Sequence, residues 1–575
     1  MGTIIQFDHV TYTYPGAEKP AIEDINLSIQ EGELVLITGP SGAGKTTFCS
    51  TLNRIVPESY AGDFQGKLLI QGKDISKRRI GDMAFISGLL FQDPSGQLTN
   101  PTVEDEIAFG PENRGLPVEK IEHLIKEYSG YVGMEAYLQR PPQALSGGQQ
   151  QSVALASVLA MEPDIYVLDE PTSNLDPLGS DLVFHLMKKL AEDKKKTVLI
   201  VEHKIEKVIN LVNRIIVMNK GHVIYDDTPE EVLRHSSELK QIGVIPPQVN
   251  QFCSWINKKK KQNLPQPKNI NQAVNTFKEI FSNKLTQEHL HNTEKRLRTY
   301  RKFTDSIIHV ENLHFGYTPD VEVLHGISLD IYKGQFVSIV GRNGSGKTTI
   351  VKHFNGLHQP SSGCVSVKGI DTRQTTVAEL SKSVGYCFQN PDHQIFSSVV
   401  ADELAYGPKN LGYTKAEIDQ TIHEVAKLLD IEDILDSNPY NLSKGQRQQI
   451  AVAAILCMKP DILIVDEPTT GQDPIQSRAM MDMMKRLNEK LGKTIIVITH
   501  DMGIAAEYSD RIVVMYMGNI IADGTPRDVF AQEELLRSSN LEAPQITRLF
   551  QHCGIKSPTI VDVDEACSLF EDIPL

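Results

Sequence analysis

The sequence predicts an α/β fold made of two tandem copies of one domain. A glycine-rich stretch occurs twice, as Gly39–Thr47 and as Gly341–Thr349, and each copy follows an apolar run of strand character. Further positions around these stretches recur at a nearly constant distance along the chain. Continuous apolar runs that alternate with helical patterns indicate a buried, mostly parallel sheet in each copy.

Both glycine-rich stretches fit the pattern G-x-x-x-x-G-K-[ST] between a strand and a helix, which is the context of a phosphate-binding loop. Glycines let backbone N–H groups point at phosphates, and the helix N-terminus adds a favourable partial charge. We expect Lys45 and Lys347 to reach the β- and γ-phosphates, with the hydroxyls of Thr46 and Thr348 on Mg²⁺. A turn that binds nothing is the alternative for one copy, and the second copy makes it negligible. The predicted nucleotide contacts in the loops are Gly39, Ser41, Gly42, Gly44, Lys45, Thr46, Thr47, Gly341, Asn343, Gly344, Gly346, Lys347, Thr348 and Thr349.

The internal repeat defines the domains. Lys45 and Lys347 are 302 residues apart (347 − 45), and Gln92 and Gln389 are 297 apart (389 − 92). The latter offset also relates Ser146 to Ser443, Asp169 to Asp466 and His203 to His500. We therefore expect a first nucleotide-binding domain over residues 1–240, a linker with one helix over 241–305, a second domain over 306–540 and an acidic tail over 541–575.

Matching apolar runs predict the strands of the two sheets. The expected core strands are Leu34–Thr38, Ile165–Leu168, Thr197–Val201 and Arg214–Met218 in the first copy, and Phe336–Val340, Ile462–Val465, Thr494–Ile498 and Arg511–Met515 in the second. The opening segments Ile4–Tyr14 and Ile308–Tyr317 have the character of an antiparallel edge.

Composition limits the function classes. A formal net charge of −15 and a pI near 5.6 argue against general nucleic-acid binding. No apolar run approaches the roughly 18–20 residues of a membrane-spanning helix, and the N-terminus does not read as a signal peptide. The seven cysteines form no C-x-x-C pair, so the sequence indicates neither a zinc site nor a disulfide framework, and it suggests the reducing cytosol. The lysines at 258–261 are predicted to lie on a solvated face, with contact to an anionic partner as the alternative.

Carboxylates follow one predicted core strand of each copy. Asp169 and Asp466 end apolar strands beside the phosphate loops, which suits Mg²⁺ ligands. Glu170 and Glu467 come next and point differently, so each can act as the base that polarises the attacking water. A strand-end turn without chemistry is the alternative, and the phosphate loops argue against it.

A histidine and a serine also recur in both copies. A histidine by itself is more often structural, but His203 and His500 stand in the same relation to Asp-Glu-Pro, a position from which the imidazole can sense the γ-phosphate. Ser146 and Ser443 precede helices rich in Ala and Val and suit N-caps. Either these serines only cap a helix, or hydroxyl and helix N-terminus hold a γ-phosphate bound elsewhere.

Phosphate loop, glutamine, Leu-Ser-x-Gly-Gln, Asp-Glu-Pro and histidine, in this order and twice, resemble the ATPase domains of ABC proteins. The resemblance covers both repeats and implies an ABC-type P-loop NTPase fold, with an antiparallel and a helical subdomain beside each parallel sheet. It implies a head-to-tail pseudo-dimer within the chain, in which ATP lies between Lys45 and Ser443 and a second ATP between Lys347 and Ser146. The residues that it implies for nucleotide binding in the serine motif are Ser146, Gly148, Gln149, Ser443, Gly445 and Gln446.

The same resemblance assigns further roles. Gln92 and Gln389 are implied as ligands that couple the Mg²⁺ site to a membrane partner. Tyr14 and Tyr317 match the aromatic residue that stacks on adenine. Asp176 and Asp473 match the acidic residue of the loop after Asp-Glu-Pro. ATP and Mg²⁺ are the implied cofactors.

A narrower resemblance lies after each glutamine. The segments from Phe91 to Asn113 and from Phe388 to Asn410 share Phe-Gln-x-Pro and Gly-Pro-x-Asn, and they are similar to energy-coupling factor (ECF) importers and their cobalt/nickel relatives, which take up vitamins and metal ions. This implies ATP hydrolysis coupled to transport, a peripheral place on the cytoplasmic face of the cell membrane, an integral membrane coupling subunit and a substrate-binding membrane subunit. Arginines of the coupling subunit would meet acidic residues that otherwise only favour a helix N-terminus. These residues are Asp105, Glu106, Asp402 and Glu403.

The two copies differ in places. Lys444 replaces the first glycine of the second serine motif, and Ser173-Asn-Leu-Asp stands against Thr470-Gly-Gln-Asp. We therefore predict two hydrolytic sites of unequal rate. The alternative function is a twin-domain ABC ATPase that acts on ribosomes, against which the acidic charge and the Phe-Gln-x-Pro segments argue. ATPases of DNA repair would need coiled coils or zinc cysteines, which the sequence does not indicate.

Overall fold

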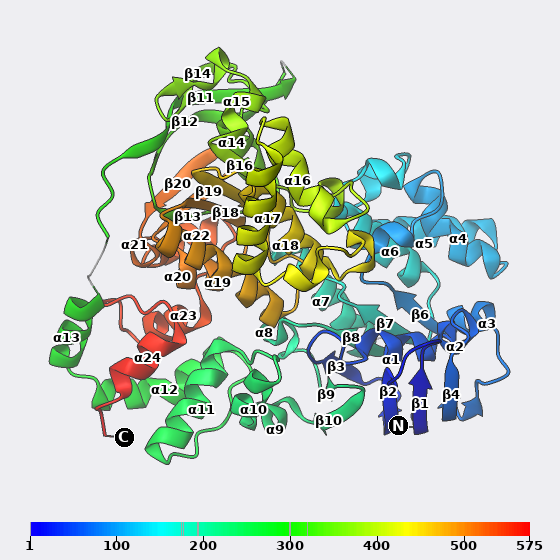
Figure 1. Ribbon diagram of the computed structural model, residues 1–575. Coiled ribbons are helices and arrows are strands. Elements are labelled where there is room, and N and C mark those ends of the chain that lie inside the picture. The colour runs from blue at the N-terminus through cyan, green and yellow to red at the C-terminus, as the bar shows by residue number, and fades with distance from the viewer. Residues whose placement is uncertain are drawn as a thin grey trace. The chain divides into compact units, whose positions relative to one another are not determined.

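The computed structural model describes residues 2–173, 175, 177–192, 195–297, 301–318 and 320–574 (Figure 1). The chain divides into two compact units, Met1–Glu279 and Ile280–Pro574, and the division falls inside helix α12 (Ile270–Lys284). Each unit contains one six-stranded and one four-stranded sheet. The predicted α/β fold with two copies of one domain is therefore confirmed.

The six-stranded sheet of the first unit carries the phosphate loop. Its order is β10-β9-β3-β8-β7-β6, and all neighbours are parallel except β9 and β10. In β7, Tyr166 and Leu168 pack into one hydrophobic core while Ile165 and Val167 pack into another. Burial on both faces explains the continuous apolar runs. The strands are β3 (Leu34–Thr38), β6 (Ser87–Leu90), β7 (Ile165–Asp169), β8 (Thr197–Val201), β9 (Arg214–Asn219) and β10 (His222–Asp227).

The second unit repeats this sheet in the order β16-β17-β18-β13-β19-β20. Every core strand predicted from the apolar runs is present in the two units, and no predicted end differs by more than one residue. The strands are β13 (Phe336–Gly341), β16 (Val384–Cys387), β17 (Ile462–Asp466), β18 (Thr494–Thr499), β19 (Arg511–Tyr516) and β20 (Asn519–Gly524).

The opening segments form separate antiparallel sheets rather than an edge of the parallel sheet. Strand β1 pairs with β2 on one side and β4 on the other, which places it in its own sheet, and β11 does the same with β12 and β14. The antiparallel edge of each six-stranded sheet is instead β10 or β20. The strands are β1 (Thr3–Thr13), β2 (Ile22–Gln30), β4 (Asp63–Ile70), β5 (Lys73–Asp74), β11 (Ser306–Thr318), β12 (Val321–Tyr332), β14 (Ser362–Val367) and β15 (Ile370–Asp371).

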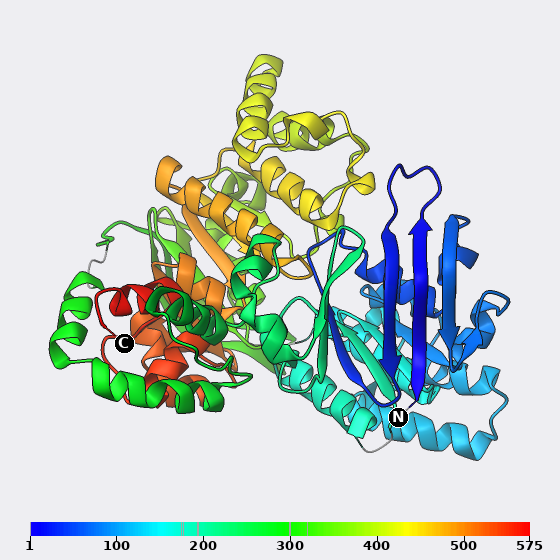
Figure 2. The same ribbon diagram turned by 90° about the horizontal axis from the view of Figure 1, so that it is seen from below.

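A group of helices completes each of the two repeated domains. In the first unit, α4–α6 lie on the opposite side of the parallel sheet from β1, β2 and β4 (Figures 1 and 2). The groups are α4 (Val103–Asn113), α5 (Val118–Tyr131) and α6 (Gly147–Ala160), and α16 (Val400–Asn410), α17 (Lys415–Leu429) and α18 (Lys444–Leu456). Other helices near the sites are α1 (Lys45–Leu52), α7 (Pro177–Glu192), α10 (Ser236–Gln241), α14 (Lys347–Phe354), α19 (Pro474–Leu491) and α20 (Met502–Tyr508). Within the described ranges, no helix combines the length and the apolar character that crossing a membrane would need.

The expected linker and tail are more ordered than the sequence suggested. In the described part of the predicted linker there are three helices rather than one: α11 (Gln248–Lys260), α12 and α13 (Gln287–Leu297). The tail contains α23 (Gln545–His552) and α24 (Val563–Phe570). Their apolar side chains are buried, among them Phe252 and Phe277 in the first unit and Leu549 and Phe570 in the second.

The pair α11–α12 is repeated as α23–α24. Asn250 Nδ2 donates to the carbonyl of Pro267 at 2.9 Å, and Thr547 Oγ1 donates to the carbonyl of Ile560 at 2.6 Å. Asn250 and Thr547 are 297 residues apart (547 − 250), the offset that relates Asp169 to Asp466. The repeated unit therefore includes a helical pair after each predicted nucleotide-binding domain.

Candidate active site

The first phosphate loop joins β3 to α1. At Gly44 the backbone φ is +96°, and a Cβ there would lie 2.4 Å from the carbonyl oxygen of Ala21, so this position requires glycine. Lys45 Nζ donates to the carbonyl oxygens of Gly39 and Pro40, both at 2.9 Å. The ammonium group is thereby held against the backbone of the loop.

The second loop, between β13 and α14, has the same construction. Lys347 Nζ donates to the carbonyl oxygens of Gly341 at 2.9 Å and Arg342 at 2.8 Å. Gly346 has a φ of +100°, and a Cβ there would meet a side-chain atom of Leu324 at 2.7 Å. Both units therefore build the loop that the motif predicts.

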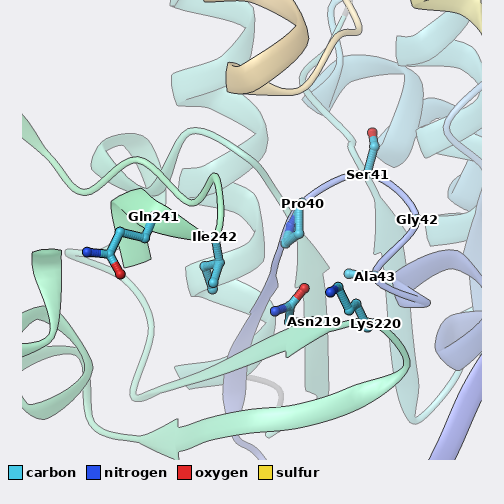
Figure 3. Close-up of a pocket in the computed structure, with 8 residues that line it drawn as sticks. All are labelled: Pro40, Ser41, Gly42, Ala43, Asn219, Lys220, Gln241 and Ile242. Atoms are coloured by element: carbon cyan, nitrogen blue, oxygen red, sulfur yellow. The ribbon is translucent and has the colours of Figure 1, made fainter. Parts of the chain in front are cut away.

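A cavity of about 370 Å³ adjoins the first phosphate loop. Figure 3 shows Ser41 pointing away from Asn219 and Lys220, which lie at the turn between β9 and β10. The residues that line it are Pro40, Ser41, Gly42, Ala43, Asn219, Lys220, Gln241 and Ile242. The loop is thus bordered by the β9–β10 turn and by the end of α10.

A hydroxyl and a carboxylate meet in each unit where Mg²⁺ is predicted. Thr46 Oγ1 donates to Asp169 Oδ2 at 2.7 Å, and Thr348 Oγ1 donates to Asp466 Oδ2 at 2.8 Å. Burial raises the pKa of Asp169 to about 6, against the lowering effect of the Thr46 hydrogen bond, and burial also raises the pKa of Asp466. A divalent cation would offset the cost of burying these carboxylates, and oxygen ligands suit Mg²⁺. The residues present therefore fit the ion.

The glutamate after each aspartate contacts the histidine. His203 Nε2 lies 3.1 Å from Glu170 Oε1, and His500 Nδ1 lies 2.9 Å from Glu467 Oε2. Glu170 and Glu467 have φ values of +50° and +49°, a left-handed conformation that is strained for a residue with a side chain and clusters at functional sites. The sequence predicts a role for each glutamate and each histidine separately. The structure brings them together in pairs, so each histidine can orient a glutamate.

The segment after the glutamate is held differently in the two units. In the second, Thr470 Oγ1 donates to Glu467 Oε2 at 3.3 Å. Burial raises the pKa of Glu467, but His500 and other neighbours outweigh it and hold the pKa below its ordinary value. In the first, Thr172 Oγ1 donates at 2.5 Å to the buried carboxylate of Glu202, a residue that the sequence did not single out.

The serine of Leu-Ser-x-Gly-Gln caps α6 and α18. The N–H of Gln149 donates to Ser146 Oγ at 3.4 Å, and the N–H of Gln446 donates to Ser443 Oγ at 3.3 Å. Each glutamine side chain accepts in return from the N–H of its serine. The capping interpretation thus describes the structure, and both serines are exposed. Contact of this motif, including Gly148 and Gly445, with nucleotide stays a prediction.

The lysine that departs from the motif lies against the segment after the second glutamate. A Cβ at Gly471 would lie 2.7 Å from Lys444 Nζ, so Gly471 makes room for the ammonium group. Asp473 caps α19 by accepting from the N–H of Gln476 at 2.8 Å. The corresponding Asp176 lies outside the described residues.

The aromatic residues predicted for adenine lie at the phosphate-loop helices. The hydroxyls of Tyr14 and Thr47 are 3.2 Å apart, as are those of Tyr317 and Thr349. The Tyr317 residue is 59% exposed. Adenine stacking stays a prediction.

Gln92 and Gln389 are predicted to share the Mg²⁺ sites with Asp169 and Asp466. Gln92 and Gln389 are exposed just beyond β6 and β16. Within the described ranges, no hydrogen bond joins either side chain to Asp169 or Asp466. Strands β6 and β7 are parallel neighbours, so the glutamine and the aspartate follow the same edge of the sheet. A ligand role stays a prediction.

Two acidic residues predicted to receive arginines have another role. Glu106 is 5% exposed, and its Oε2 accepts from the N–H groups of Thr99 and Asn100 at 2.9 and 2.8 Å. Glu403 is 4% exposed and bonds two backbone N–H groups of its own loop in the same way, at 3.1 and 2.9 Å. These carboxylates fix the loops before α4 and α16 and are not accessible to a partner. That part of the expectation is corrected.

Their neighbours Asp105 and Asp402 are exposed. Large aromatic side chains are exposed on the same segments: Phe109 is 53% exposed and Tyr406 51%. In the second unit, the ring of Tyr406 lies edge-on to that of Phe396, with centroids 4.5 Å apart.

Comparison with known proteins places both units in one family. The family described as ABC transporter matches residues 22–173 and 324–470. An ABC transporter ATP-binding protein of Caldanaerobacter subterraneus subsp. tengcongensis is 42% identical over 554 residues, 96% of each chain, and one of Methanosarcina acetivorans is 37% identical over 99% of this chain and 94% of its own. The solved structure of CbiO1 from Clostridium perfringens, described as part of the ABC transporter complex CbiONQ, is 36% identical and covers 43% of this chain and 100% of its own, with a TM-score of 0.39. The chain belongs to the ABC transporter family and is an ATPase with two tandem ATP-binding domains.

Proposed function

We propose that this protein is the ATP-hydrolysing subunit of an ECF-type importer for a vitamin or a transition-metal ion. The observation that carries the proposal is the segment after each glutamine, which repeats the same ECF-like pattern from Phe91 to Asn113 and from Phe388 to Asn410. The partners are an integral membrane coupling subunit and a membrane subunit that binds the substrate. The chain lies on the cytoplasmic face of the membrane as a peripheral protein.

The surface of these segments supports docking of a membrane subunit. Exposed aromatic side chains mark protein interfaces. In the first unit these are Phe91 and Phe109, and Phe109 shares α4 with the exposed Asp105. In the second unit they are Phe388, Phe396, Tyr406 and Tyr440, and Tyr406 shares α16 with the exposed Asp402. A coupling helix with apolar and basic side chains would match both surfaces.

The proposed chemistry uses the same parts in each unit. Thr46 and Asp169 would hold Mg²⁺ in the first unit, and bound Mg²⁺ neutralises charge on the β- and γ-phosphates. Lys45 binds the same phosphates from the loop. Glu170 accepts a proton from the attacking water, and His203 holds its carboxylate in place. The second unit uses Lys347, Thr348, Asp466, Glu467 and His500 in the same roles.

The resemblance to ABC ATPases also supports composite sites. Ser443 would complete the site of Lys45, and Ser146 that of Lys347. Lys444 stands beside Ser443, so a positive charge would differ between the two sites. This difference supports unequal turnover.

Copurification tests the proposal. Tagged full-length protein is isolated from detergent-solubilised membranes of its source organism, and bound proteins are identified by mass spectrometry. We expect an integral membrane partner, encoded near this gene, that is lost from Phe396→Ser/Tyr406→Ser and retained by Leu491→Ser, a control at an exposed residue of α19. Stable association with ribosomes in place of a membrane protein would support the alternative function.

A further inference from the structure

A buried carboxylate precedes the histidine in the first unit. Glu202 directly follows β8, is 5% exposed, and donates its N–H to the carbonyl oxygen of Ile37. The corresponding residue of the second unit, 297 positions later (499 − 202), is Thr499, whose hydroxyl accepts from the N–H of Asp501 at 3.0 Å. A small neutral side chain thus completes the same strand end in the second unit. The fold alone does not require a carboxylate here.

Glu202 bonds the segment that carries the proposed base. Its Oε1 accepts from Thr172 Oγ1 at 2.5 Å, and Thr172 is itself 5% exposed. Thr172 lies two residues after Glu170, and the next N–H, of Ser173, donates to the carbonyl oxygen of Glu170 at 3.2 Å. Burial raises the pKa of Glu202, and the Thr172 hydrogen bond opposes this. Burying a carboxylate costs free energy even when it accepts a hydrogen bond. Because only the first unit has a carboxylate at this position, we expect a role specific to that unit.

The second unit fixes the equivalent segment by another route. Thr469 corresponds to Thr172, and within the described ranges its hydroxyl has no hydrogen-bond partner. The next residue, Thr470, donates instead to the base Glu467 at 3.3 Å. In the second unit the segment is tied to the carboxylate of the base, whereas in the first unit it is tied to Glu202. In both units the base contacts its histidine.

We propose that Glu202 is a positioning residue of the first ATP site, which holds Thr172 and thereby fixes the backbone of Glu170 and the direction of its carboxylate. The proposal rests on the proposed role of Glu170 as base. Both bases have a left-handed φ, +50° at Glu170 and +49° at Glu467. In the first unit the Glu202–Thr172 hydrogen bond holds the segment that follows this strained residue.

Turnover of ATP by the full chain tests the proposal, in the wild-type background and with Glu467→Gln, which silences the second base. We compare Glu202→Thr, the residue of the second unit, with Glu202→Gln, which keeps an acceptor for Thr172, and with Thr172→Val, which removes the donor. Thr469→Val is the matched control in the second unit. Thermal unfolding of each variant separates loss of fold from loss of positioning.

We expect Glu202→Thr and Thr172→Val each to lower kcat of the first site about 10-fold with KM for ATP unchanged, because a misplaced base affects the chemical step. The double variant Glu202→Thr/Thr172→Val should have about the same kcat as either single variant, because both substitutions remove the same hydrogen bond. Glu202→Gln should keep kcat within about twofold of the wild-type value. Thr469→Val should leave kcat of the first site unchanged.

Unchanged kcat in both Glu202→Thr and Thr172→Val would overturn the proposal, provided that Glu170→Gln abolishes turnover of the first site. If Glu170→Gln also left turnover intact, the proposed base would be wrong instead. Where Glu202→Thr unfolds, Thr172→Val decides alone, because it leaves the carboxylate in place.

Discussion

The hydroxyl of Thr46 donates a 2.7 Å hydrogen bond to the carboxylate of Asp169, which lies 123 positions later in the chain. Thr348 and Asp466 repeat this relationship at 2.8 Å across 118 positions. A phosphate loop and a strand end that are distant in sequence are thus joined by the parallel sheet. Each unit has the parts of a cation site next to the lysine that is proposed to bind phosphate.

Replacing both bases should stop turnover without stopping binding. In Glu170→Gln/Glu467→Gln, the amide cannot accept a proton from water, so we expect kcat for ATP to fall by about 100-fold or more. The affinity for ATP, measured by equilibrium binding with a fluorescent analogue, should change by less than about threefold, because the phosphate loops are intact. Turnover near that of the wild type would contradict the assignment of both glutamates.

Pairs of loop and serine variants should reveal how the sites are composed. Lys45→Ala and Ser443→Arg would damage one composite site, so the double variant should retain about the turnover of Lys45→Ala alone. Lys45→Ala with Ser146→Arg would damage both sites and should abolish ATPase activity. Steady-state phosphate release measures both combinations. Equal residual activity of the two double variants would rule out the head-to-tail arrangement.

Acidification should destabilise the second unit through a buried histidine. His353 is fully buried on α14, its Nδ1 lies 2.8 Å from the carbonyl oxygen of Thr349, and burial lowers its pKa from 6.5 to about 4. Between these values the unfolded chain binds a proton that the folded chain does not, so the free energy of unfolding falls as pH decreases from 6.5 towards 4, by about 1–3 kcal/mol. His358 acts in the same direction, since burial lowers its pKa too.

Thermal unfolding of the full chain at pH 7 and pH 5 measures this effect. His353→Gln, which cannot take up the proton, should show a smaller drop in unfolding temperature than the wild type. His423→Gln, at an exposed position, should behave as the wild type. An unchanged drop in His353→Gln would show that His353 is not the source of the effect.

Adjacent acidic residues of α4 should differ in their effects. Glu106→Ala leaves the N–H groups of Thr99 and Asn100 unpaired and should lower the free energy of unfolding by about 1–3 kcal/mol. Asp105→Asn is exposed and should leave stability within about 0.5 kcal/mol while weakening capture of the membrane partner. Chemical denaturation and copurification are the two measurements. A stable Glu106→Ala would show that the loop does not depend on this carboxylate.

Local sequence was sufficient for the predicted core strands and for locating the phosphate loops. Buried parallel strands such as Ile165–Asp169 are apolar on both faces, so their runs are visible without any partner. Turns at phosphate loops need glycine at positions such as Gly44, which leaves a readable motif.

Features that depend on distant partners were not predictable in this way. Glu106 and Asp105 look alike in sequence, and only packing decides that one is buried and the other exposed. Glu202 reads as the end of a strand, because its partner Thr172 lies 30 positions away. The repeat of α11–α12 in α23–α24 was hidden because the spacing from Pro247 to Phe277 is four residues longer than that from Pro544 to Phe570.

The helical pair α23–α24 shows that much of the predicted linker, 241–305, belongs to the repeated unit. Since α11–α12 has its counterpart in α23–α24, the connecting segment between the repeats lies between the end of α12 and the start of β11, where the described residues form α13. Two repeats of similar build, each with its own helical pair, follow one another along the chain on either side of this segment. The natural place to separate the chain into two coexpressed halves is therefore between residues 285 and 305, and a cut near residue 240 would strip the first half of its closing helices.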